Sequence, residues 1–178
     1  MLPSRGAALL LATWALAAVA CAGARGTPLP DRPVDFTFEL GGETMRLSDL
    51  RGRPAVLVLV RISELTSELY LRQVEKAWER EAGKVRFAVL SLEPAERPLL
   101  EEYAEFNELP FEIGLAEWRV ASGQSALGRI PIVPTTYFLD EKGRVADAAP
   151  GAIPAAEIEK RVEKLGWNEV REVGGPVF

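Results

Sequence analysis

The chain has 178 residues, of which 48% are hydrophobic and 26% charged, and its formal net charge is −5. This length and composition suit a single globular domain with a real core, and no basic stripe points to nucleic-acid binding. The sequence contains no histidine and one cysteine, so an intrachain disulfide is impossible and a soft-metal site is not expected. No cofactor is expected either.

The amino-terminal segment predicts export. Residues 1–20 resemble a signal peptide, in which a positive charge precedes an apolar run that ends in small residues. The run Leu16–Cys21 resembles a bacterial lipobox, with Ala18 where that pattern prefers Leu. We therefore predict a lipidated Cys21 that anchors the chain to the membrane; an ordinary secretory signal with an incidental Cys21 is the alternative. Because Ala22 follows the cysteine, we expect the periplasmic face of a bacterial outer membrane.

Composition divides the rest of the chain. Residues 22–33 are rich in Gly, Ala and Pro, which favours an extended linker over packed structure. We expect a lipidated cysteine and tether at 21–33, a folded domain at 34–166 and a carboxy-terminal tail at 167–178.

Strand and helix patterns alternate along that domain. Asp35–Leu40 and Thr44–Leu47, joined by two glycines, predict a β-hairpin, and the apolar run Ala55–Val60 predicts a strand buried on both faces. Apolar residues at near-helical spacing from Leu65 to Trp78 predict a helix with these side chains on one face. The expected helices are Thr66–Glu81, Ala95–Asn107 and Pro154–Leu165, the further strands Val85–Leu92, Thr135–Leu139 and Arg144–Ala148, with one or two short helices in Gly114–Gly128. This order predicts an α/β fold with a mixed central sheet and helices on both faces.

A family resemblance rests on three stretches. They are Phe36–Leu40 with Leu47–Pro54, then Val133–Asp140, and Gly143–Val145 leading to Gly151. Together they resemble the thioredoxin-like superfamily, in its membrane-anchored TlpA/ResA-like and redoxin branch, over about Val34–Leu165. The resemblance implies a thioredoxin-like fold. It also implies a Cys-x-x-Cys pair at the amino end of the helix after the first buried strand, where the helix dipole stabilises a thiolate.

The two cysteine positions implied by the family fall on Glu64 and Ser67. Neither side chain forms a disulfide, and no cysteine follows Cys21, so no catalytic residue is expected. A hydroxyl also cannot replace the thiolate of a peroxide-reducing relative. We expect Ser63 or Glu64 to cap the helix. An acid–base role for Glu64 with the neighbouring hydroxyls is the alternative.

Pro134 stands where the family places a cis-proline beside its cysteines. The resemblance implies that the preceding residue, here Val133, offers backbone groups to an extended peptide, although a fold also keeps such a proline for turn geometry alone. Val133, Pro134 and Thr135 are therefore candidate groove residues. Trp118 is expected to pack into the core or under a lid.

The sequence thus predicts a redox-inactive thioredoxin-fold lipoprotein of the bacterial envelope that binds envelope proteins or serves as a scaffold subunit. Two alternatives stay open. One is an oxidoreductase role with thiols supplied by a partner, and the other is a non-redox enzyme that uses Glu64. The fold alone does not choose between them.

Overall fold

The structure, a computed structural model, describes residues 29–94 and 97–166. The predicted signal peptide, Cys21 and the tail at 167–178 lie outside the described residues, so the division of the chain around the domain stays a prediction. Within the two described ranges, no helix has both the length and the apolar character needed to span a bilayer.

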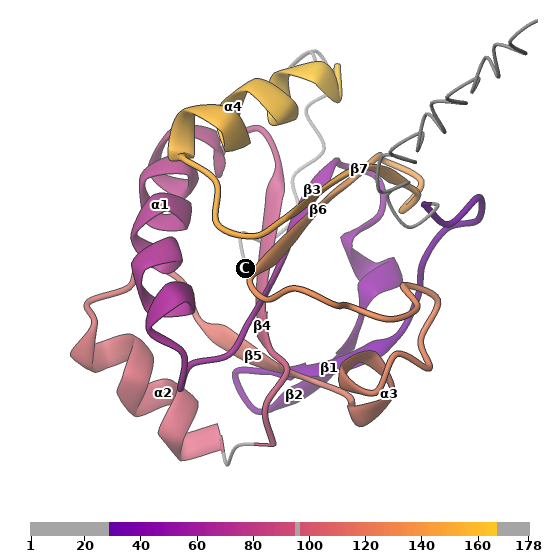
Figure 1. Cartoon of the computed structure of the whole chain (residues 1–178). Helices are drawn as coiled ribbons and strands as arrows, with labels where there is room; N and C mark the ends of the chain where they lie inside the picture. The colour runs from indigo at the N-terminus through magenta and orange to yellow at the C-terminus, as the bar shows by residue number, and fades with distance from the viewer. Residues whose placement is uncertain (1–28, 95–96, 167–178) are drawn as a thin grey trace, which may run out of the picture.

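A seven-stranded mixed sheet organises the described residues (Figure 1). Its order is β2-β1-β5-β4-β3-β6-β7. Strand β4 pairs in parallel with β3 and β5, whereas the β1–β2, β1–β5, β3–β6 and β6–β7 pairs are antiparallel. The strands are β1 Thr37–Leu40, β2 Glu43–Arg46, β3 Ala55–Val60, β4 Arg86–Ser91, β5 Ile113–Ala116, β6 Thr135–Leu139 and β7 Val145–Pro150.

Helices cover both faces of this sheet, as predicted. Helix α1 (Leu65–Glu81) packs beside α4 (Ala155–Lys164) on one face, and α2 (Arg97–Phe106) adds a buried leucine to the same core. The 3₁₀ turn Leu47–Leu50 and the short helix α3 (Trp118–Ala121) contribute buried side chains to the core on the other face. The predicted α/β fold, with its amino-terminal hairpin, is confirmed.

Burial on both faces explains the uninterrupted apolar sequence of the central strand β3. Leu57 and Leu59 point into the core beneath the 3₁₀ turn and α3, whereas Val56, Val58 and Val60 point into the core beneath α1 and α4. All of these side chains are buried, and each such burial is worth roughly 1.5–3 kcal/mol. A strand that is buried on both faces needs an uninterrupted apolar run, which is why its bounds were predicted correctly.

Three details of the sequence-based expectations are wrong. Strand β5 lies partly in the stretch expected to hold only short helices. Trp118 is 64% exposed instead of packed, because it stands on the outer side of a helix of a single turn. Leu65 and Leu69 do not share the buried face of α1, which consists of Ser67, Tyr70, Leu71, Val74, Ala77 and Glu81.

Candidate functional site

The chain passes from β3 into α1 through a turn that is held by two carboxylates. Glu64 is the N-cap residue of α1, but its side chain caps nothing and instead accepts a hydrogen bond from Nη1 of Arg61 at 3.0 Å. Ser63 donates its N–H to Oε2 of Glu93 at 3.0 Å and its hydroxyl to Oε1 of the same carboxylate. Glu64 thus occupies the N-cap position, as predicted, but neither Glu64 nor Ser63 supplies the side-chain hydrogen bond of a cap. Both side chains bind other partners instead: Arg61 within the turn and Glu93 in the loop after β4.

Ser67 sits one turn into the helix and is fully buried. Its Oγ accepts a hydrogen bond from the backbone N–H of Arg61 at 3.1 Å, and its own N–H donates to the carbonyl of Glu64 at 2.9 Å. The hydroxyl thus satisfies a backbone amide of the turn. It is shielded from solvent, so it offers no accessible nucleophile.

Pro134 lies at the same end of the sheet as Glu64 and Ser67. The β3–β6 ladder pairs Leu59 with Thr135, which places Pro134 beside the end of β3, where the chain leaves for α1. The Val133–Pro134 peptide bond is cis. The carbonyl of Pro134 accepts a hydrogen bond from the N–H of Gly151 at 2.8 Å. Thr135 is buried and directs its hydroxyl to the carbonyl of Ile132 at 2.5 Å.

The backbone of Val133 is unpaired. Within the described part of the chain, neither its N–H nor its C=O takes part in a hydrogen bond. Its side chain is half-buried and packs against the core beneath α3. The residue before the cis-proline therefore presents two free backbone groups from a fixed position, which is what pairing with an added strand requires.

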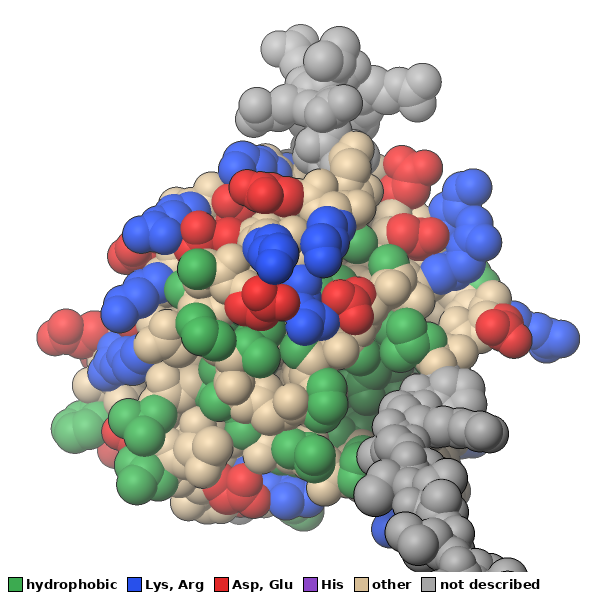
Figure 2. Space-filling view, turned by 45° about the horizontal axis from the view of Figure 1, so that its top comes forward, with side chains coloured by type: hydrophobic (Ala, Val, Ile, Leu, Met, Phe, Trp, Pro, Cys, Tyr) green, Lys and Arg blue, Asp and Glu red, His purple; other side chains and the backbone are tan. Residues whose placement is uncertain are grey.

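Large apolar side chains surround this end of α1. Leu65 is 67% exposed, Leu69 62% and Ile132 48%. In the space-filling view, hydrophobic side chains gather in the lower part of the face and charged side chains crowd its upper part (Figure 2). Leu65 and Leu69 are four residues apart on α1 and lie on the same face, and exposed apolar side chains that lie together mark interaction sites more often than isolated leucines do.

A shallow groove of about 490 Å³ runs between the start of α1 and the β7–α4 connection. None of the residues that line it is charged. Ala152, in that lining, follows Gly151, whose N–H donates to the carbonyl of Pro134, so the cis-proline lies near this end of the groove. The lining residues are Leu65, Thr66, Leu69, Tyr70, Gln73, Ala152, Ile153 and Pro154.

Tyr70 forms the inner wall of the groove without supplying acid–base chemistry. Its hydroxyl is 2.6 Å from Oγ1 of Thr136, and the side chain is almost wholly buried. Burial raises the pKa of Tyr70 to about 12, so the phenol stays protonated at neutral pH. Among the described residues, no group of three His, Cys, Asp or Glu side chains is placed to hold a metal ion.

The sequence predicts that Glu64, Ser67 and Pro134 lie at this end of the sheet, but it does not predict the apolar groove beside them. The sequence predicts Leu65 and Leu69 on the same helix face as Val74 and Ala77, and it predicts neither the exposure of Ile132 nor the contact of Glu93 with Ser63. One signal was present: Leu65 and Leu69 lie four residues apart, so they share a face of the helix. A second apolar stripe beside the buried one predicts a surface for a partner.

No protein-family model matches the chain, and no curated protein matches it. Solved structures do. StoA from Bacillus subtilis is 20% identical with a TM-score of 0.60, covering 74% of this chain and 98% of its own. The exposed lipoprotein thioredoxin Etrx1 from Streptococcus pneumoniae is 14% identical with a TM-score of 0.60, covering 73% and 98%. A thioredoxin-family thiol:disulfide interchange protein from Chlorobium tepidum is 15% identical with a TM-score of 0.64, covering 78% and 98%.

At these identities the similarity establishes the fold. The seven-stranded sheet, the helix after β3 and the cis-proline at the start of β6 all agree with it. The one cysteine of the sequence precedes the domain, so the domain contains no Cys-x-x-Cys pair. The chain has the thioredoxin-like fold and resembles the TlpA/ResA-like thiol–disulfide oxidoreductases without the two cysteines that would perform their reaction.

Proposed function

We propose that this protein is a redox-inactive thioredoxin-fold subunit that binds a protein of the bacterial envelope through the groove at the start of α1. One observation carries the proposal: an uncharged apolar groove adjoins a cis-proline whose preceding residue has free backbone groups. The partner contributes an extended segment. Its backbone pairs with Val133, and its apolar side chains cover Leu65 and Leu69.

The chemistry of the site supports binding over catalysis. A thiol–disulfide exchange needs a thiolate, and the two relevant positions hold a carboxylate and a hydroxyl. The carboxylate of Glu64 is paired with Arg61, and the hydroxyl of Ser67 is buried and already accepts a hydrogen bond. General acid–base catalysis needs a second positioned group, whereas in the described part of the chain the side chains of Glu64 and Ser67 both bind Arg61.

Attachment to the membrane is part of the proposal. We infer that Cys21 carries the lipid and that the domain faces the periplasm from the outer membrane. The lipobox-like run before Cys21 supports this inference, as does the similarity to Etrx1, which is an exposed lipoprotein. Incorporation of labelled palmitate into the full chain, and its loss in Cys21→Ser, is the expected result. Equal labelling of both chains would contradict the inference.

Photo-crosslinking in intact cells tests the groove. A photoreactive amino acid is placed in the full chain at Leu65 or at Ile132, and in a third chain at Leu99 on α2. Leu99 is a matched control because it is 52% exposed but lies on α2, neither in the groove lining nor near the cis-proline in sequence, as Ile132 is. We expect the same crosslinked species from positions 65 and 132 and its absence from position 99.

A charged substitution distinguishes specific binding in the groove from nonspecific hydrophobic association. Leu65→Glu places a carboxylate on the apolar surface without disturbing the core, since the side chain is 67% exposed. The crosslink from position 132 should then fall severalfold, whereas Leu99→Glu should leave it unchanged. An unaltered crosslink in Leu65→Glu, or equal loss in both variants, would refute binding through this groove.

A further inference from the structure

A second, larger cavity lies beside α2 and is separate from the groove at the start of α1. Its volume is about 760 Å³, within the range of ligand-binding clefts. It lies between the hairpin β1–β2 and α2, with β4 and the segment before β5 between them. It shares no lining residue with the groove beside the cis-proline.

The cavity is present because β5 pairs with β1 and β4 over only a few residues. Its ladder with β4 begins at the Val89–Ile113 pair, so Phe87 and Ala88 have no β5 residue opposite them. Before Ile113 the chain turns toward α1, where Phe111 packs against Trp78 with ring centroids 6.3 Å apart. The start of β4 is therefore left open on this side.

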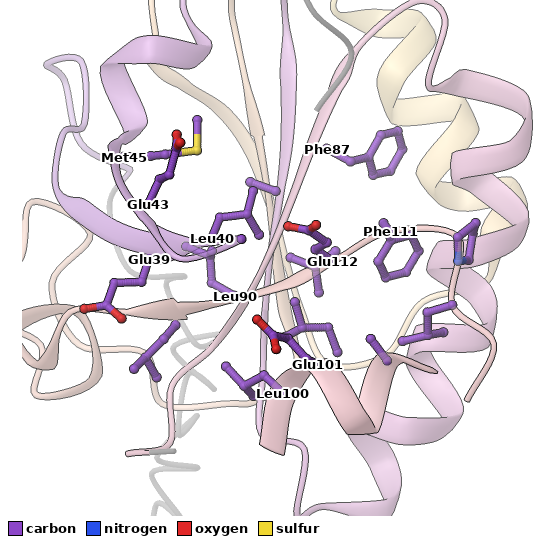
Figure 3. Close-up of a pocket in the computed structure, with 18 of the residues that line it drawn as sticks. Glu39, Leu40, Glu43, Met45, Phe87, Leu90, Leu100, Glu101, Phe111 and Glu112 are labelled. Carbon is purple, nitrogen blue, oxygen red and sulfur yellow. The ribbon is translucent and has the colours of Figure 1, made fainter. Parts of the chain in front are cut away.

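The walls of the cavity are apolar and only partly covered. Large side chains from four separate parts of the fold expose some of their surface there: Leu40, Met45, Trp78, Phe87 and Phe111. Figure 3 shows Leu40 and Leu90 near the middle, with Phe87 and Phe111 together at one side. Such surface favours an occupant with large apolar groups.

The charge around this surface has one sign. Five exposed glutamates line the cavity, and no lysine or arginine does so among the described residues. Figure 3 shows Glu39 and Glu43 on the hairpin side and Glu101 and Glu112 on the other side of the same space. The fifth is Glu105, one turn along α2 from Glu101.

Most of these carboxylates have no cationic partner. Glu39, Glu43, Glu105 and Glu112 form no ion pair within the described part of the chain. Carboxylates accept hydrogen bonds and donate none, so they select an occupant rich in cationic donors. Like charges gathered around an apolar wall also attract an oppositely charged segment over distances of about a Debye length.

We propose that this cavity binds a basic amphipathic segment of a partner protein, in which lysine or arginine residues alternate with large apolar ones. The apolar residues cover the aromatic wall, and the cations reach the glutamates on both sides. Long basic side chains suit this arrangement because their methylene stems pack on apolar surface while their heads stay at the rim. The tail of this chain does not match, since 167–178 carries one arginine against two glutamates.

Direct binding of a model segment tests the proposal. The probe is a fluorescent peptide of alternating lysine and leucine, titrated with the full chain in a non-ionic detergent and followed by anisotropy. Glu43→Gln, Glu105→Gln and Glu112→Gln should each weaken binding about two- to fivefold, the range for exposed ion pairs. Glu102→Gln is the matched control, because Glu102 is an exposed neighbour on α2 that does not line the cavity.

Two further probes make the result decisive. A peptide of alternating glutamate and leucine, and one of alternating lysine and serine, should both bind at least tenfold more weakly than the lysine–leucine peptide. Hydrogen exchange should slow at 40–45 and 109–113 on binding, and not at 132–134. Equal binding of either control peptide would overturn the proposal, as would unchanged binding in a chain that carries Glu43→Gln, Glu105→Gln and Glu112→Gln together. Loss of binding in Glu102→Gln, or protection confined to 132–134, would also overturn it.

Discussion

The hydrogen bond between Tyr70 and Thr136 ties α1 to β6 directly beneath the proposed groove. Its oxygens are 2.6 Å apart, and the two residues are 1% and 0% exposed. Tyr70→Phe removes one hydroxyl and leaves the other buried without this partner. A buried polar group without a partner costs about 1–3 kcal/mol, so we expect the free energy of unfolding to fall by that amount. Thr136→Val should have a similar effect, because it leaves the tyrosine hydroxyl in the same position.

The double variant distinguishes this reasoning from a simple loss of packing. With both hydroxyls removed, no unsatisfied group remains, so the loss should be smaller than the sum of the single losses by about 1 kcal/mol or more. Urea unfolding of the full chains, followed by tryptophan fluorescence, measures the three losses. Tyr137→Phe is the control, since its hydroxyl has no hydrogen bond in the described part of the chain. Strictly additive losses would show that the two hydroxyls act independently and would refute the argument.

Three other substitutions should change the free energy of unfolding. Burial raises the pKa of Tyr70 from 10.0 to about 12, so the tyrosine of the unfolded chain loses its proton at lower pH than that of the folded chain. The free energy of unfolding should therefore fall as the pH rises from 10 through 12. This fall should be about 3 kcal/mol larger in the wild type than in Tyr70→Phe. Gly114→Ala should cost about 1–3 kcal/mol in urea unfolding, because its Cβ would lie 2.6 Å from the carbonyl oxygen of Glu39. Arg161→Ala should cost roughly 1–3 kcal/mol, since this side chain contacts Asp147 at 2.8 Å and lies over the ring of Phe138. Unchanged stability in any of these variants would contradict the contact assigned to it.

The sequence predicts best those strands whose own residues have a clear strand pattern. The predicted bounds of Ala55–Val60 and Thr135–Leu139 agree with the structure, because both strands are buried along their whole length and are rich in β-branched, aliphatic or aromatic residues. Strand β5 was missed for the opposite reason. It has four residues, one of them glycine, and it becomes a strand by pairing with β1 and β4, which are distant in sequence.

The candidate site was only partly predictable. Counting along the family's pattern placed Glu64 and Ser67 at the start of α1, because that count needs only local structure. The contact of Ser63 with Glu93 joins residues 30 positions apart and depends on two loops meeting. The prediction that Leu65 and Leu69 share one face of α1 with Val74 and Ala77 is wrong, because the first two are exposed and the last two are buried. Near-helical spacing alone does not show which of two adjacent helix faces is buried.

Arg61 explains why the two replaced cysteine positions need not serve any reaction. Its guanidinium holds Glu64, and its backbone N–H is satisfied by Ser67, so both side chains stabilise the turn into α1. The proposed binding depends instead on Leu65, Ile132 and the backbone of Val133. Glu64→Gln should therefore leave the crosslink from position 132 unchanged, whereas Leu65→Glu should reduce it. The reverse result, with function lost in Glu64→Gln and kept in Leu65→Glu, would favour the acid–base alternative over a binding subunit.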